Sequence, residues 1–260
     1  MKLKFVYWFY APNREFPIIY KYHFACLRRY INVFDDILII LAVDDTNDIA
    51  YINKLEKMFL DLNIGKNLSF KIYQNDPIFR EALGFKNEII DNLYNSKELV
   101  FFGHSKGFTN ILSPSLKYWI AAMYYFNLSN IDKVKYHLME DLSMFYGYTV
   151  MRGAAVSNKY NWHYPGSFYW LNCPAIAAEV KHIPNFTNRF YAEMFPGMVT
   201  ELTMEQFRKG SWAGKYFLEG DYNFYINSRY YLSLCFSEEE MQQLDEFVAE
   251  LDKEVENSKT

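Results

Sequence analysis

The first hundred residues alternate between short apolar runs and longer segments in which apolar residues recur every three or four positions. The apolar runs are residues 3–10, 37–43, 68–73 and 98–102, and the segments with helical spacing are residues 17–33, 49–62 and 80–94. The run 37–43 is apolar throughout, as expected of a strand with both faces covered. Repeated strand-then-helix units predict an α/β fold with a mostly parallel central sheet and helices on both faces.

Helix-capping residues organise the second half of the chain. Ser113-Pro114 opens a helix through Phe126, and the pattern from Ser129 to Asp132 opens another through about Phe145. Further strands are predicted at 148–152 and 167–171, and short helices at 175–183 and 185–195. From Ser237 onward the tail is predicted to be one capped amphipathic helix. The sequence has no repeat or low-complexity linker, so we expect one domain over residues 1–260.

Composition and charge exclude some classes of protein. The net charge of −4 and the pI of about 5.8 argue against a broad nucleic-acid-binding surface. Three widely spaced cysteines without a C-x-x-C pair suit reduced, intracellular thiols and no zinc site. The apolar runs are far shorter than the roughly 20 residues that span a bilayer, and no signal-peptide cleavage site follows the first of them. We therefore expect a cytoplasmic protein without a nucleic-acid partner, and attachment to the inner face of a membrane stays open.

Polar side chains follow two of the predicted strands. Asp44 and Asp45 come directly after residues 37–43, and His104 and Lys106 come after 98–102. Because ligands of parallel sheets bind at the carboxyl ends of the strands, these side chains are candidates for one site. A carboxylate there accepts from a base or a ribose hydroxyl, and the two cations suit a diphosphate. The alternative is a helix cap at the aspartates and a solvated turn from His104 to Gly107.

Two later segments combine polar and aromatic side chains. Around the turn at Pro165-Gly166 the chain gathers Trp162, His163, Ser167, Tyr169, Trp170 and Asn172. Core packing explains the aromatic rings, but the polar residues among them favour a pocket for a sugar. Glu193 stands four residues after Arg189 and shortly before Pro196-Gly197. It either pairs with Arg189 on a helix or faces the site as a general base.

The order of these motifs resembles nucleotide-sugar glycosyltransferases of the GT-A fold. The segment from Val43 to Asp48 looks like their Asp-Asp strand end, and residues 84–90 look like their Asn-bearing helix. Where those enzymes carry Asp-x-Asp, this chain has His104-Ser105-Lys106. That departure is similar to a smaller group of polysaccharide-biosynthesis glycosyltransferases with His-x-Lys-Gly at this strand end. Their later motifs resemble residues 163–170 and 192–197, and the whole resemblance covers roughly residues 3–200.

The resemblance implies an enzyme that moves a sugar from a nucleotide-sugar donor to a glycan or lipid-linked acceptor, in the synthesis of a capsule or other surface polysaccharide. The implied nucleotide and diphosphate ligands are Asp44, Asp45, Asn87, His104, Lys106 and Gly107, and the implied acceptor or sugar ligands are Trp162, Ser167, Tyr169, Trp170 and Asn172. Glu193 or His163 would deprotonate the acceptor hydroxyl in an inverting displacement. In this interpretation residues 1–110 form the nucleotide-binding half, 111–236 the acceptor half and 237–260 a C-terminal helix.

Metal dependence stays open at this stage. Mn²⁺ or Mg²⁺ is compatible with the resemblance, but the usual Asp-x-Asp ligands are absent, so the sequence predicts no metal-binding residue. The missing ligands also suit a non-catalytic nucleotide- or glycan-binding protein on a degenerate GT-A fold. A phosphoesterase using His104 and Asp44 is a third class. The sequence lacks G-x-x-x-x-G-K-[ST], G-x-G-x-x-G, G-x-S-x-G and H-E-x-x-H, which argues against a Walker ATPase, a standard Rossmann dehydrogenase, an α/β-hydrolase and a zincin.

Overall fold

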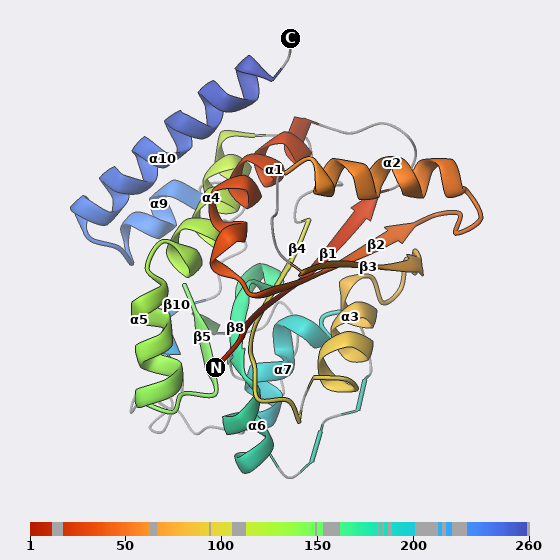
Figure 1. Cartoon of the computed structure of the whole chain (residues 1–260). Helices are drawn as coiled ribbons and strands as arrows, with labels where there is room; N and C mark the ends of the chain where they lie inside the picture. Colours follow the sequence, from red (N-terminus) through yellow and green to blue (C-terminus); the bar gives the residue numbers. More distant parts are fainter. Residues whose placement is uncertain are drawn as a thin grey trace.

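A seven-stranded sheet forms the centre of the molecule (Figure 1). The computed structural model describes residues 1–11, 18–62, 67–93, 95–105, 113–148, 150–152, 162–180, 182–183, 185–186, 189–200, 213–214, 217–219 and 228–258. The strands lie in the order β3-β2-β1-β4-β8-β5-β9. Their bounds are β1 Leu3–Ala11, β2 Asp36–Val43, β3 Asn67–Gln74, β4 Leu99–His104, β5 Phe145–Gly147, β8 Tyr169–Asn172 and β9 Ala213–Gly214. The first four in spatial order are parallel, and β8 runs antiparallel to β4 and β5.

Helices cover both faces of the sheet, which confirms the predicted fold class (Figure 1). On one face lie α1 Ile18–Tyr30, α2 Ile49–Leu60, α4 Pro114–Leu128, α9 Ser228–Ser233 and α10 Glu238–Asn257. On the other lie α3 Glu81–Gly84 with the π-helical turn 85–90, α6 Cys173–Glu179 and α7 Tyr191–Thr200. A second sheet has the order β10 Phe217–Glu219, β6 Val150–Arg152 and β7 Trp162–His163.

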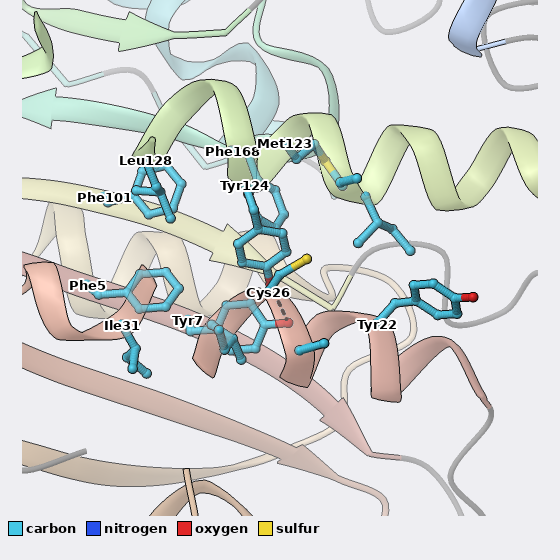
Figure 2. Packing of buried hydrophobic residues seen from close by; sticks show 14 of the residues in the cluster. Phe5, Tyr7, Tyr22, Cys26, Ile31, Phe101, Met123, Tyr124, Leu128 and Phe168 are labelled. Carbon is cyan, nitrogen blue, oxygen red and sulfur yellow. Dashed lines mark hydrogen bonds between the residues drawn. The ribbon is translucent and has the colours of Figure 1, made fainter. Parts of the chain in front are cut away.

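The alternation of side chains along β1 and β2 divides the core into two layers. Phe5 and Tyr7 point into the layer beneath α1 and α4, whereas Val6 and Trp8 point into the layer beneath α3 and α7. Both strands are buried on both faces, as the apolar sequence of 37–43 predicts. In the first layer Tyr124 Oη donates to Tyr7 Oη over 3.2 Å, as Figure 2 shows among the surrounding apolar side chains. The helices are therefore attached to the sheet by packing and by a buried polar contact.

Local capping signals fix several helix starts. The Asp48 carboxylate accepts from Tyr51 N at the start of α2, and the Ser113 hydroxyl accepts from Leu116 N at the start of α4. Ser237 and Glu240 form a reciprocal capping box on α10, as predicted. One predicted cap is wrong by a residue, because Ser129 ends α4 while the Asn130 side chain caps α5 Ile131–Lys135.

Two predicted helices differ from the structure in their bounds. The helix expected through about Phe145 ends with the π-helical turn 136–140, and Phe145 instead begins β5. The helix expected at 185–195 is α7 at Tyr191–Thr200, so Pro196 and Gly197 lie inside it rather than after it. Pro196 has no N–H for the carbonyl of Ala192, and the Tyr169 hydroxyl donates to that carbonyl over 2.6 Å instead. A side-chain donor from β8 thus permits a proline within the helix.

The sheet passes without interruption from the first to the second half of the chain. β4 belongs to residues 1–110 and its neighbour β8 to residues 111–236, and the two strands are hydrogen-bonded. The predicted C-terminal helix is present as α10 and packs on α1 and α4. Within the described part of the chain, no helix combines the length and the apolar character needed to cross a bilayer.

Candidate functional site

The parallel strands end together at one edge of the sheet. The chain builds outward from β1 through β2 to β3, then returns to the other side of β1 to form β4. The point between β1 and β4 is therefore a topological switch point, where ligands of open α/β sheets bind. Tyr10 and Ala11 end β1, and His104 ends β4 and is followed by Ser105, with Trp8 opposite His104 in register.

Backbone and side-chain bonds hold the end of β4 against β1. Ser105 N donates to Trp8 O, and Ser105 Oγ accepts from Tyr10 N, each over 2.9 Å. Ser105 is thus used to fix the strand end. His104 is largely buried, with Nδ1 3.8 Å from Glu81 Oε1 at the start of α3 and its ring 5.9 Å from that of Phe168. Lys106 and Gly107, predicted to contact the diphosphate, lie outside the described residues.

The structure separates the roles of the aspartates that follow β2. Asp48 caps α2, and Asp45 Oδ1 accepts from Asn47 N over 2.8 Å in a tight turn. Asp44 is exposed and accepts instead from the side chain of Asn75, which follows β3. Asn75 Nδ2 also donates to Tyr10 Oη over 3.2 Å. Asp44, rather than Asp45, therefore belongs to the polar group with Asn75 and Tyr10 at the carboxyl edge of the sheet.

Asn75 and Arg80 also lie at this carboxyl edge of the sheet, and the sequence analysis did not predict either of them. Arg80 is exposed, has a positive φ of 49° and takes part in no salt bridge between described residues. Burial and the charge of Asp44 raise the pKa of Tyr10, whereas the Arg80 charge acts to lower it, so Arg80 lies close enough for its charge to act on this phenol. Both residues follow the third predicted parallel strand. Because ligands bind at the carboxyl ends of such strands, their position after this strand is the signal in the sequence that could have identified them.

The turn Pro165–Ser167, called the Pro-Gly turn below, brings the second group of predicted residues to β4. It packs against β4 and α7. Gly166 N donates to Glu193 Oε1 over 3.0 Å, and Glu193 is buried. Ser167 is fully buried with φ 54°, and its hydroxyl has no partner among the described residues. His163 is buried on β7, which packs against α7. Glu193, Ser167 and His104 thus come from three separate segments that pack together.

The predicted aromatic stacking surface does not fit the structure. Trp162, Tyr169 and Trp170 are each at most 2 % exposed. Trp170 lies among Phe34 and Phe101 and donates to Asn127 O, and Tyr169 stacks on Tyr164. These rings pack against protein on all sides and leave no face for an acceptor sugar. The polar residues next to them in sequence suggested a pocket. Whether the rings are accessible to a sugar depends on tertiary packing, which the sequence pattern does not reveal.

One of the two other predicted ligands, Asn172, lies away from the switch point. Asn172 pairs with Leu99 at the opposite end of β4, five residue steps or about 17 Å from His104. Its side chain caps α6 and donates to Ser143 O, which is a structural role. Asn87 lies in the π-helical turn beside Tyr73 of β3, whose ring centroid is 5.7 Å from that of Trp8, the residue opposite His104. Burial and a hydrogen bond to Glu88 raise the pKa of Tyr73 to about 12, and a hydrogen bond with Asn87 opposes them.

Metal-binding and thiol chemistry find little support in the described residues. No group of three or more His, Cys, Asp or Glu side chains among them could hold a metal ion. Burial raises the pKa of Cys26, raises that of Cys173 to about 12 and raises that of Cys235 to about 11. These thiols therefore stay protonated and poorly nucleophilic near neutral pH.

Comparison with protein-family models gives no match, and no curated protein matches the sequence.

Proposed function

We propose that this chain is a glycosyltransferase of GT-A type that moves a sugar from a nucleotide-sugar donor to a glycan or lipid-linked acceptor in surface polysaccharide biosynthesis. One observation carries the proposal. The segments that resemble such enzymes are distant in sequence but lie close together in the structure. The segments after β2 and β4 lie at the carboxyl edge of the parallel strands, and the Pro-Gly turn packs on both β4 and α7.

The donor nucleotide would lie across the ends of β1, β2 and β3, beside Tyr10, Asp44 and Asn75. Its diphosphate would face β4, where His104 lies beside Glu81 and the exposed Arg80 supplies positive charge. Lys106 follows two residues after His104 in sequence and would add a second cation. Cations at this point offset the charge that develops on the departing nucleoside diphosphate.

The described residues do not fit a divalent cation at this strand end. The Ser105 hydroxyl accepts from Tyr10 N, and Glu81 is the carboxylate found beside His104. We therefore derive no step through a metal and assign the leaving-group charge to the protein cations.

The acceptor would approach from the Pro-Gly turn. Because Glu193 Oε1 already accepts from Gly166 N, we assign Glu193 to holding this turn. His163, the other base candidate, would then receive the acceptor proton.

The first test is a thermal-shift panel of UDP, GDP, CDP, TDP and CMP, each with and without Mn²⁺. A nucleoside diphosphate at 100 times its dissociation constant adds about 2.7 kcal/mol to the free energy of unfolding, which gives a clear rise in Tm. We expect one diphosphate to stabilise the protein without Mn²⁺. No shift from any nucleotide would contradict the donor site, and a shift that requires Mn²⁺ would contradict the assignment of charge to the protein cations.

A second candidate is a non-catalytic nucleotide-binding protein on the same fold. The engagement of Glu193 by Gly166 and the lack of a described metal site favour it. The two are separated by incubating the protein with the nucleotide sugars of the base found in the panel and measuring release of the nucleoside diphosphate. Release that is lost in Lys106→Ala, with Tm unchanged, supports the transferase. Tight binding without release by the wild type supports the binding protein.

A further inference from the structure

The outer side of β3 is an edge of the central sheet. β3 pairs with β2 at all eight positions from Asn67 to Gln74, and no other strand in the described part of the chain is hydrogen-bonded to it (Figure 1). Proteins usually protect such an edge with a short strand, a proline, a bulge or outward-pointing lysines. β3 is long, regular and free of proline, and its one charged side chain, Lys71, is held by the buried Glu88 carboxylate over 2.5 Å. None of these protections therefore blocks pairing along β3.

One hydrogen bond shows which backbone groups of β3 lie on this edge. Asn75 N donates to Val43 O of β2 over 2.7 Å. The N–H and C=O groups of one residue in a strand point to the same side, and those of the next residue point to the other side. Odd-numbered residues of β3 therefore bond to β2, and the N–H and C=O groups of Leu68, Phe70 and Ile72 point away from the sheet.

The side chains of the same three residues form an apolar row on one face of β3. Leu68 and Phe70 are partly buried against the core layer beneath α2, and Ile72 is 36 % exposed. The row is symmetric about Phe70, because an apolar residue stands two positions before it and another two positions after it. A second strand of the same sequence, running antiparallel, would place Phe70 opposite Phe70 and Leu68 opposite Ile72 on the same face.

We infer that two copies of this chain associate by antiparallel pairing of their β3 strands about a two-fold axis at Phe70, so that one sheet runs through both copies. The outward backbone groups of Leu68, Phe70 and Ile72 exchange about six hydrogen bonds in this arrangement. Their side chains form one apolar ladder across the axis. Each copy uses its only β3 edge, so the association closes at a dimer. The inference does not rest on the proposed function.

Charge and strand length select this register. A shift by one residue would bring the apolar face of one copy opposite the polar face of the other. An axis at Lys71 would place two lysines directly opposite each other, which is destabilising. An axis at Ser69 would leave Ile72 beyond the first residue of the other β3. With the axis at Phe70, Lys71 faces Ser69 of the second copy and all three apolar residues are paired.

The test is sedimentation equilibrium of the full chain from about 1 µM to about 100 µM. We expect the mass to rise with concentration from the 31.0 kDa of one chain toward twice that value. Because one strand from each copy makes a small interface, the dissociation constant should be on the order of 10 µM.

Two substitutions of Ile72 test the backbone and the side-chain contacts. Ile72→Pro removes an outward N–H and leaves the bonds to β2 in place, so the fold should be retained. Ile72→Lys places a charge in the apolar ladder. We expect each to raise the dissociation constant at least about tenfold. Leu234→Lys is the matched control, since Leu234 is 62 % exposed and follows α9, and it should leave the dimer unchanged.

A double variant tests the register. In Leu68→Glu/Ile72→Lys each glutamate faces a lysine of the second copy, so we expect dimers at least about threefold tighter than those of Ile72→Lys alone. Urea unfolding of every variant confirms that it is folded.

Three results would overturn the inference. One is a wild type that stays monomeric over the whole range or forms species larger than a dimer. Another is a dimer that folded Ile72→Pro and Ile72→Lys leave intact, because the contact would then lie elsewhere. The third is a folded double variant that dimerises no better than Ile72→Lys, which would contradict the pairing of Leu68 with Ile72.

Discussion

At the scale of the residue, Arg80 combines an unfavourable backbone conformation with an exposed positive charge. Its φ of 49° lies where side chains with a Cβ are rarely found, and such conformations cost about 1–3 kcal/mol. The same residue stands at the carboxyl edge of the sheet, where its charge acts on Tyr10. Strain of this kind persists where the surrounding structure holds it, and a role in binding gives a reason for keeping arginine instead of glycine.

We therefore expect Arg80→Gly to separate stability from binding. Glycine adopts positive φ without strain, so the free energy of unfolding should stay constant or rise by up to about 1 kcal/mol. Affinity for the preferred nucleoside diphosphate should fall about tenfold or more, because a charge-assisted contact is lost. Urea unfolding and calorimetry measure the two quantities. Arg28→Gln on α1 is the control for the loss of a positive charge, since a glycine at this position would itself destabilise the helix. Unchanged nucleotide affinity in Arg80→Gly would make Arg80 a solvated loop residue.

At Glu193 a single substitution that replaces one carboxylate oxygen by an amide nitrogen separates a structural role from a catalytic one. In Glu193→Gln the oxygen that accepts from Gly166 N is retained, whereas the basicity is lost. Since we assign Glu193 to positioning, we expect this variant to keep nucleotide-sugar turnover within about tenfold. Glu193→Ala should lower the free energy of unfolding by about 1–3 kcal/mol because the buried Gly166 N–H loses its acceptor. A well-folded Gln variant with turnover reduced 10²-fold or more would identify Glu193 as the general base.

At the scale of the element, α7 shows how a helix accommodates Pro196-Gly197. Pro196 cannot donate to the Ala192 carbonyl, which accepts from the Tyr169 hydroxyl instead. Gly197 allows α7 to approach β7 closely, because a Cβ at this position would stand 2.2 Å from the Trp162 carbonyl oxygen. The two residues set how α7 packs on β7 and β8. The motif that resembles a catalytic segment therefore also has a packing function.

Removal of the Tyr169 hydroxyl tests this account. We expect Tyr169→Phe to lower the free energy of unfolding by about 1–3 kcal/mol, because a buried carbonyl loses its donor while ring packing is preserved. Tyr230→Phe is the matched control, since Tyr230 is 53 % exposed and its loss of a hydroxyl should cost less than about 0.5 kcal/mol. Equal stability of Tyr169→Phe and the wild type would mean that the Ala192 carbonyl is satisfied in another way.

The parts of the fold that could be predicted from sequence are those set by local patterns. The apolar runs, the caps at Asp48 and Ser237 and the carboxyl-end rule located the parallel strands, α2, α10 and the positions of Asp44 and His104. Asn75 and Arg80 were missed because nothing in their own segment connects them with Tyr10; the register of three strands does. Tyr169, Trp170 and Asn172 were assigned to a pocket because their burial depends on β4, α4 and α6, which periodicity does not reveal.

At the scale of the whole molecule, α10 is bound to α1, α4 and α9 by polar and charged contacts as well as by an apolar stripe. Asp252 accepts from Lys117 over 2.6 Å and from the Tyr22 hydroxyl, and Asp245 pairs with Arg229 over 2.6 Å. Partial burial acts to raise the pKa of Asp252, but the contacts with Lys117 and Tyr22 outweigh it and the pKa is lowered. The Arg229 hydrogen bond lowers the pKa of Asp245.

These shifts predict a loss of stability in acid. A carboxyl group whose pKa is lower in the folded state stabilises the fold above its unfolded pKa of about 3.9 and loses that contribution as pH falls through the folded value. We expect the free energy of unfolding, measured by urea at pH 7, 5 and 3, to hold to pH 5 and then fall, with at most about 1 kcal/mol from each pair because both are partly exposed. Asp245→Asn/Asp252→Asn should show a smaller fall below pH 5. An equal fall in both proteins would place the acid sensitivity elsewhere.

The antiparallel pairing of β8 with β4 has a consequence for how the chain matures on the ribosome. β1 to β4 are complete once residue 104 is made, but the strand that covers the outer edge of β4 ends only at Asn172. Throughout the intervening synthesis, β4 presents unpaired amides and carbonyls on a strand of Leu, Val and Phe, the kind of edge that recruits other extended chains. Chains interrupted between these two points would therefore self-associate, and slow translation of this stretch would demand a chaperone.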